Sequence, residues 1–336
     1  NRYTVFIHKI AKGEIVMNKP VLLKPAFKDY LWGGTKLRDI YGKECDMTPI
    51  AESWELSAHE DGQSVVASGE YTGLTLSEYI EKCGREVIGT QGMKFDKFPI
   101  LIKFIDAKGD LSIQVHPDDS YALKNEGEYG KTEVWYVMSA EEGAALYYGF
   151  KKEITKEEYR RRIEDNTICD VLNRVEAEQG DVFFIQPGTV HAIGAGLMIC
   201  EIQQNSNTTY RVYDFGRKGA DGKPRELHID KAIDVSRLVP SESADSSTGT
   251  ETKDGYTIRT VAKCKYFTSE RIVVEEKADI PVDKSSFRSV VITEGNPVLR
   301  MNGVQFDLKA GDSVFVPAQE GVIEIIGSCG MLLSYV

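Results

Sequence analysis

Short apolar runs bounded by Gly, Pro and Asp recur along the whole chain, and they restrict its fold more than any other feature. Ser64–Ala67, Ile100–Ile105, Glu133–Met138 and Val182–Ile185 are examples of strand length, rich in β-branched and aromatic residues. Many short strands with few helices favour a sandwich or small barrel over a βαβ array. The sequence also lacks the GxGxxG and GxxxxGK[ST] fingerprints of nucleotide-binding α/β folds. We therefore predict a mostly β protein.

Three helical segments interrupt these strands. Thr75-Leu-Ser-Glu78 is a capping box that predicts a helix to about Cys83, and Thr155-Lys-Glu-Glu158 predicts a second helix to about Asp165. The third, about Ile229–Ser236, lies a few residues after a proline.

The polar segment Pro240–Gly255 is the clearest boundary in the 336 residues, a length that suggests about two domains. It is rich in Ser, Thr and Gly and has almost nothing to bury, which favours an exposed linker over 241–255. The prediction is a larger domain at 17–240 and a smaller β domain at 256–336. Residues 1–16 are interpreted as an N-terminal extension, because Met17 opens a better strand pattern.

A weak internal repeat supports two related β units. Gly180–His191 and Gly311–Val322 each place Gly-Asp before an apolar strand that ends at a proline. The second copy has no histidine. The two units can therefore share an architecture without sharing a chemistry.

Composition excludes several classes of function. The chain has 52 acidic and 41 basic residues, a net charge of −11, and no run of Lys and Arg, so we expect neither a nucleic-acid nor a membrane partner. Six scattered cysteines without a CxxC pair indicate reduced thiols in a cytoplasmic protein. The sequence does not determine the oligomeric state.

Polar side chains alternate along Leu111–Asp119 and suggest the wall of a pocket. Side chains two residues apart share one face of a strand, so Ser112, Gln114 and His116 should point the same way. Lys131 and Glu133 share a face for the same reason.

His116, Glu133, His191 and possibly Gln114 offer nitrogen and oxygen ligands suited to a divalent transition metal such as Zn²⁺. A single histidine at a strand end is more often a hydrogen-bonded structural residue, and the gaps between the ligands are wide. Two histidines and one carboxylate also suit Fe(II), which leaves a non-haem oxygenase open.

Several segments resemble one enzyme family. Leu111–Asp119, Gly130–Tyr136 and Gln186–Tyr213 are similar to the type I mannose-6-phosphate isomerases, zinc enzymes built from cupin (jelly-roll) domains. Further matches are Leu31-Trp-Gly-Gly34, Ala51-Glu-Ser-Trp-Glu-Leu-Ser57 and Phe98-Pro-Ile-Leu-Ile-Lys-Phe104. Together, all the matching segments cover about Lys24–Arg217. The chain looks like the short bacterial form. This resemblance implies a catalytic cupin domain, with a degenerate cupin-like domain after the linker. A non-catalytic cupin that binds a sugar phosphate is a third alternative, beside the isomerase and the oxygenase.

The resemblance also implies site residues. It places one Zn²⁺ on His116, Glu133, His191 and Gln114; the alternative for the short form is that Gln114 contacts a ligand and not the metal itself. It places substrate contacts at Lys103, Ser112, Lys131 and Arg211. The larger enzymes carry an Asp four positions before this arginine, where this chain has Asn207.

The implied reaction interconverts mannose 6-phosphate and fructose 6-phosphate through a cis-enediol. A metal ion can stabilise the oxyanion charge that develops on the sugar, and the cations of Lys103, Lys131 and Arg211 can anchor a phosphate despite the acidic net charge. Arg211 and Lys131 are the predicted catalytic residues. A lysine with a lowered pKa is the preferred proton-transfer base; a metal-bound water, Glu52 and Glu55 remain alternatives.

Overall fold

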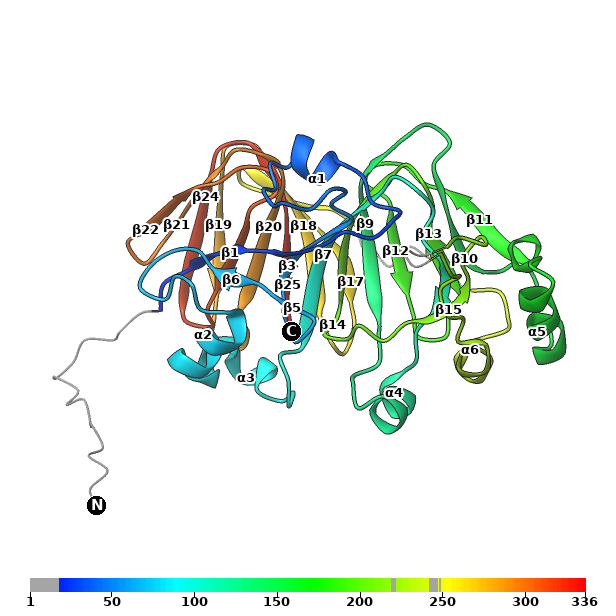
Figure 1. Cartoon of the computed structure of the whole chain (residues 1–336). Coiled ribbons are helices and arrows are strands. Elements are labelled where there is room, and N and C mark those ends of the chain that lie inside the picture. The colour runs from blue at the N-terminus through cyan, green and yellow to red at the C-terminus, as the bar shows by residue number, and fades with distance from the viewer. Residues whose placement is uncertain (1–17, 219–221, 242–246, 248) are drawn as a thin grey trace, which may run out of the picture.

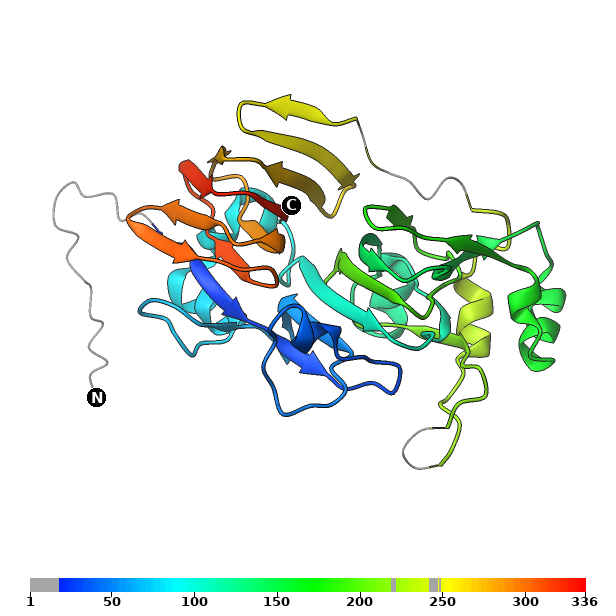
Figure 2. The ribbon, with the colours of Figure 1, turned by 90° about the horizontal axis from the view of Figure 1, so that it is seen from above.

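The computed structural model describes residues 18–218, 222–241, 247 and 249–336. Two β-rich halves stand side by side, each built from antiparallel strands (Figure 1, Figure 2). The prediction of a mostly β protein is therefore confirmed. Within the described residues, no helix is long and apolar enough to cross a membrane.

The first half pairs a six-stranded sheet with a five-stranded one. The larger sheet has the order β12-β9-β14-β7-β3-β2, made of β2 (Ala26–Lys28), β3 (Glu52–Leu56), β7 (Ile100–Ala107), β9 (Glu133–Ala140), β12 (Val182–Ile185) and β14 (Leu197–Gln204). The smaller sheet has the order β11-β10-β13-β8-β15, made of β8 (Ile113–Val115), β10 (Ala145–Phe150), β11 (Leu172–Glu176), β13 (His191–Ile193) and β15 (Tyr210–Tyr213). Trp135, Leu146 and Ile199 belong to the apolar core between the two sheets.

The second half has the same layered plan. Its eight-stranded sheet has the order β16-β17-β18-β25-β20-β23-β1-β6, made of β1 (Val21–Lys24), β6 (Val65–Val66), β16 (Glu251–Lys253), β17 (Tyr256–Lys263), β18 (Thr268–Val274), β20 (Arg288–Gly295), β23 (Ser313–Val316) and β25 (Cys329–Tyr335). The facing four-stranded sheet is β19-β24-β21-β22, made of β19 (Lys277–Val282), β21 (Val298–Met301), β22 (Val304–Asp307) and β24 (Gly321–Ile326). A separate ribbon pairs β4 (Ala58–His59) with β5 (Gly62–Gln63).

The internal repeat predicted from the sequence is confirmed by the strand order. The run β12-β9-β14-β7-β3-β2 corresponds, strand for strand, to β23-β20-β25-β18-β17-β16, and β11-β10-β13-β8 corresponds to β22-β21-β24-β19. The registers agree as well. Ile185 pairs with Glu133, and Val316, at the equivalent place after its Gly-Asp, pairs with Arg288. The two halves are thus two versions of one β plan.

Two strands near the N-terminus belong to the second half. β1 and β6 extend the sheet of the second half, because β1 pairs with β23 on one side and with β6 on the other. The segment predicted as a linker, 241–255, includes β16. Because β1 and β6 precede residue 240 and yet belong to the sheet of the second half, the sheets do not divide at that residue. The predicted domain boundary at residue 240 therefore stays a prediction. The predicted extension 1–16 lies outside the described residues.

All three predicted helices are present, as α2 (Leu76–Cys83), α5 (Lys156–Glu164) and α6 (Ile229–Val235). Thr75 and Glu78 form the expected capping box at α2. The prediction missed α1 (Lys36–Asp39), α3 (Gly89–Gly92), α4 (Asp119–Asn125), η1 (Arg85–Ile88) and η2 (Ile168–Asp170). All of these except α4 have only three or four residues, too few to show an apolar period in the sequence.

Candidate metal centre and adjoining cleft

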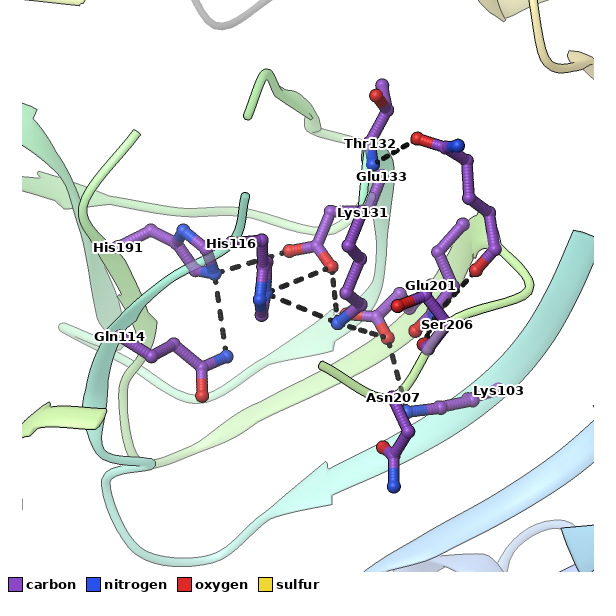
Figure 3. A network of polar contacts seen from close by, with 12 residues as sticks. Lys103, Gln114, His116, Lys131, Thr132, Glu133, His191, Glu201, Ser206 and Asn207 are labelled. Atoms are coloured by element: carbon purple, nitrogen blue, oxygen red, sulfur yellow. Dashed lines mark hydrogen bonds and ion pairs between the residues drawn. The ribbon is translucent and has the colours of Figure 1, made fainter. Parts of the chain in front are cut away.

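Three predicted metal ligands meet inside the first half. His116 follows β8, His191 begins β13, and Glu133 begins β9 of the opposite sheet. One ligand atom from each lies within 4.8 Å of the others, and all three side chains are buried (Figure 3). Residues far apart in the sequence therefore converge between the two sheets.

Backbone carbonyls fix the orientation of both imidazoles. His116 Nδ1 lies 3.0 Å from the Thr208 carbonyl oxygen, and His191 Nδ1 lies 2.8 Å from that of Thr189. A carbonyl can only accept, so Nδ1 must carry the proton in each ring. The lone pair at Nε2 is then directed toward Glu133, whose oxygens are 3.6 Å from His116 Nε2 and 3.3 Å from His191 Nε2.

The electrostatics of the three residues fit a cation. Burial lowers the pKa of His191 to about 4, and burial with the charge of Lys131 lowers the pKa of His116 well below its ordinary value. Both rings are therefore neutral, the form in which an imidazole can bind a metal ion. Burial and the charge of Glu201 raise the pKa of Glu133 to about 8. Glu133 Oε1 is buried without a hydrogen bond from any described residue, and Oε2 has the Lys131 ammonium at 2.7 Å. A divalent ion at Oε1 would further offset the cost of ionising this carboxylate.

Gln114 lies beside the same centre. It pairs with His191 across β8 and β13, and its Nε2 lies 3.4 Å from His191 Nε2. The oxygen and nitrogen of an amide exchange places by a half-turn, which would present the oxygen at the same point.

A buried cluster of charges adjoins the ligands. Lys131 Nζ is 2.7 Å from Glu133 Oε2 and 3.6 Å from Glu201 Oε1 (Figure 3). Lys103 Nζ is 3.7 Å from that Glu201 oxygen and 3.6 Å from Glu52 Oε2. Two lysines and three carboxylates thus share one polar region deep in the fold.

The pKa shift of Lys131 is opposite to the expected one. We predicted that burial and neighbouring cations would lower the pKa of a lysine beside the metal, either Lys131 or Lys103. Burial does lower the pKa of Lys131, but the charges of Glu133 and Glu201 raise it further, and the net shift is upward. Without a metal ion, Lys131 is therefore a protonated hydrogen-bond donor.

A cleft of about 230 Å³ opens over this cluster. All four predicted substrate residues line it, namely Lys103, Ser112, Lys131 and Arg211, together with Gln114. Arg211 lies on β15 opposite Gln114 of β8, and its Nη1 donates to the Glu226 carbonyl at 2.9 Å. The three predicted ligands lie behind the cleft wall, next to Lys131 and Gln114, and the predicted substrate residues form part of that wall.

The sequence analysis missed two charged residues that line the cleft, Glu201 and Arg225. Glu201 interrupts the apolar strand β14, and a lone carboxylate at such a position was a usable signal. Arg225 gave no local signal. It reaches the cleft wall while donating to Asp214 at 2.6 and 2.7 Å.

The structure distinguishes between Glu52 and Glu55, the two carboxylates considered as alternative bases. Glu52 lines the cleft, whereas Glu55 does not. Glu55 is bonded to Lys43 at 2.7 Å and to Ser53 at 2.6 Å. Because Lys43 also donates to the Gly311 carbonyl of the second half, Glu55 is part of the contact between the halves. Glu55 is therefore withdrawn as a candidate base.

One acidic side chain organises the segment that holds His116. Glu128 Oε2 accepts hydrogen bonds from Ser206 Oγ, Asn207 N and Thr208 Oγ1, at 3.3, 3.2 and 2.9 Å. His59 Nε2 lies 3.2 Å from Glu128 Oε1. The Asn207 side chain donates to Asp61 at 2.7 Å. Glu128 thereby holds the Thr208 carbonyl in the position where it accepts from His116 Nδ1.

Comparison with known proteins identifies the family. The catalytic domain of phosphomannose isomerase type I matches residues 21–140, and the cupin domain of mannose-6-phosphate isomerase matches residues 257–336. The mannose-6-phosphate isomerase ManA of Bacillus subtilis is 38% identical over 94% of this chain and 99% of its own length. The chain belongs to the type I phosphomannose isomerase family.

Other relatives agree with this family assignment. The mannose-6-phosphate isomerase of Streptococcus mutans is 37% identical over 93% of this chain and 98% of its own length. A crystal structure of the mannose 6-phosphate isomerase from Bacillus subtilis superposes with a TM-score of 0.89, at 38% identity, and covers 95% of this chain and all of the other. The similarity spans both halves, so the C-terminal β unit is the family's cupin domain.

Proposed function

We propose that this chain interconverts mannose 6-phosphate and fructose 6-phosphate with the help of a bound metal ion. One observation carries the proposal. The buried set His116, Glu133 and His191 lies directly beside a cleft lined by Lys103, Lys131 and Arg211. The relatives named as mannose-6-phosphate isomerases match this chain over nearly its whole length.

The metal that the ligand chemistry fits best is one Zn²⁺ per chain. His116, Glu133 and His191 would hold it, and the amide oxygen of Gln114 would be a further ligand. Two neutral imidazoles and one carboxylate form a typical catalytic zinc set that keeps a position open. When bound, the ion supplies Lewis acidity to the oxygens on C1 and C2 of the sugar.

The cationic residues on the cleft wall would stabilise the negative charge that develops on the sugar during the reaction. An aldose and a ketose interconvert when a proton moves between C1 and C2, and the intermediate cis-enediol carries negative charge on oxygen. Lys131, held by Glu133 and Glu201, would donate a hydrogen bond to that oxygen. Arg211 would add a second cation on the same wall.

A carboxylate is the best candidate for the base that moves the proton between C1 and C2. Glu201 Oε2 accepts a hydrogen bond from Trp135 Nε1 at 2.9 Å, and this bond fixes the carboxylate. Its Oε1 is buried without a hydrogen bond from any described residue and lies between the ammonium groups of Lys103 and Lys131. We assign the transfer between C1 and C2 to this oxygen, in place of the lysine that the sequence favoured.

The phosphate group would lie at the arginine side of the cleft. Arg211 and Arg225 both line the cleft. Burial is the main cause of the lowered pKa of Arg211, and the nearby positive charge of Arg225 lowers it further. Two guanidinium groups can bind a phosphate through paired hydrogen bonds, and Ser112 offers a hydroxyl nearby. A local cluster of this kind acts within a Debye length of about 8 Å, so it can attract a dianion to an acidic protein.

The compartment and other partners rest on composition. The cysteines are free thiols, which agrees with the reducing cytoplasm. The acidic net charge of −11 gives no basis for a nucleic-acid or membrane partner.

A coupled assay tests the proposal. Mannose 6-phosphate is supplied, and fructose 6-phosphate is measured with the purified protein, with the protein after chelation, and after Zn²⁺ is added back. We expect activity to be lost on chelation and restored by Zn²⁺. Turnover that requires Fe(II) and O₂ would favour an oxygenase instead, and binding of the sugar phosphate without turnover would favour a non-catalytic cupin.

A further inference from the structure

A second cleft lies in the C-terminal half, in the place that corresponds to the catalytic cleft. It has a volume of about 300 Å³, and its lining includes Arg288, Glu270, Tyr335 and Tyr256. The residues come from β17, β18, β20 and β25, the strands equivalent to β3, β7, β9 and β14 of the first half. The repeat therefore supplies the same architectural position twice.

The register identifies which residues correspond. Arg288 is the counterpart of Glu133, since each begins its strand and pairs with the equivalent residue of the neighbouring strand. Along the next two strands, Leu333 pairs with Glu270 as Glu201 pairs with Lys103. The basic and acidic positions of the catalytic cleft are thus exchanged in the second cleft.

The exchange removes metal chemistry from this cleft. No histidine occurs after residue 240, and an arginine stands where the carboxylate ligand would be. A guanidinium remains charged and only donates hydrogen bonds, so it cannot bind a metal ion.

Two opposite charges, Arg288 and Glu270, face this cleft without a direct ion pair between them, and Glu270 is hydrogen-bonded to Tyr335. Arg288 is only 8% exposed and lies over the ring of Tyr335, with 4.3 Å from Cζ to the ring centroid. Its Nη1 donates to the carbonyls of Ser286 and Phe287 at 2.9 and 3.2 Å. In the described structure no ion pair within 4.0 Å joins Arg288 to the half-buried Glu270. Nε and Nη2 of Arg288 therefore remain able to donate to a ligand.

We propose that this cleft binds a small uncharged polyhydroxyl molecule of the hexose class, independently of any metal. A hydroxyl group can accept from Arg288 and donate to Glu270 at once, because it is both donor and acceptor. The rings of Tyr256 and Tyr335 can cover the C–H faces of a sugar. Charged lining residues balance, with Glu251 and Glu270 against Lys253 and Arg288, so the cleft does not favour a phosphorylated ligand.

Saturation-transfer NMR with D-mannose and D-glucose tests the proposal on the zinc-loaded, full-length protein. We expect a saturable signal that persists in Lys103→Gln, which alters only the catalytic cleft. Glu270→Gln keeps the shape of the side chain, and we expect it to weaken hexose binding by about tenfold or more. Arg288→Gln should do the same. Arg300→Gln removes a positive charge at an exposed position of β21 in the same half and should leave binding unchanged.

The outcomes separate the possible sources of binding. Loss of the signal in Lys103→Gln with normal binding in Glu270→Gln would place the hexose in the catalytic cleft and overturn the proposal. Absence of any saturable hexose signal, or preferential binding of a zwitterion such as serine, would overturn it too. Because Arg288 also holds two carbonyls, the melting temperature of each variant is measured, and Glu270→Gln decides if Arg288→Gln does not fold.

Discussion

Glu128 gives the sharpest test of how the metal centre is held. Glu128→Ala removes the acceptor shared by Ser206, Asn207 and Thr208, and so releases the segment whose carbonyl orients His116. No proposed ligand is changed. Loss of an outer partner of a metal-binding histidine typically costs about 10–100-fold in metal affinity, or about 1.4–2.7 kcal/mol. Since three hydrogen bonds to one carboxylate disappear together, we expect the upper half of that range.

The matched control is in the same loop. Glu126 also accepts hydrogen bonds, at 2.7 Å from Lys231 and 2.8 Å from Tyr210, but it does not touch the segment that holds His116. Zinc affinity is measured by competition with a chromophoric chelator for wild type, Glu128→Ala and Glu126→Ala. We expect weaker zinc binding only in Glu128→Ala. Equal affinities in the two variants would refute the reasoning.

Three further predictions concern charged groups. Lys43→Met leaves the Glu55 carboxylate buried without its cationic partner, and should lower the free energy of unfolding by about 3–5 kcal/mol in urea denaturation. The folded variant should keep its turnover, and a loss of stability below about 1 kcal/mol would contradict this prediction. Lys131→Met should lower kcat in the isomerase assay by about 10²–10³, and an unchanged kcat would remove Lys131 from the mechanism. Burial raises the pKa of Asp214, but hydrogen bonds from Arg225 and Arg217 outweigh it, and the net shift is downward. The ionised carboxylate therefore stabilises the fold at pH values above the pKa of Asp214 in the unfolded chain, and this stabilisation is lost as the pH falls through its pKa in the folded protein. Asp214→Asn should therefore destabilise the protein at pH 7 but much less at about pH 3, as followed by thermal melts.

Local patterns in the sequence predicted what depends on local physics. Alternation along one strand placed Ser112 and Gln114 on the cleft wall, and the capping box predicted α2, because each depends on residues a few positions apart. The resemblance supplied the set of ligands that the fold brings together.

Features that depend on distant contacts were not predictable in this way. β1 pairs with a strand near the C-terminus, and no pattern around Val21–Lys24 announces that partner. The net pKa shift of Lys131 depends on Glu201, which approaches it only through the pairing of β9 with β14. The role of Glu128 likewise exists only once the loop after α4 meets the segment at Thr208.

Zinc anomalous diffraction from crystals of the zinc-loaded protein tests the central claim most directly. The account predicts one peak per chain, at about 2.0–2.2 Å from an imidazole nitrogen of His116, an imidazole nitrogen of His191 and a carboxylate oxygen of Glu133. A zinc peak elsewhere in the chain, with these three side chains left without metal, would contradict it.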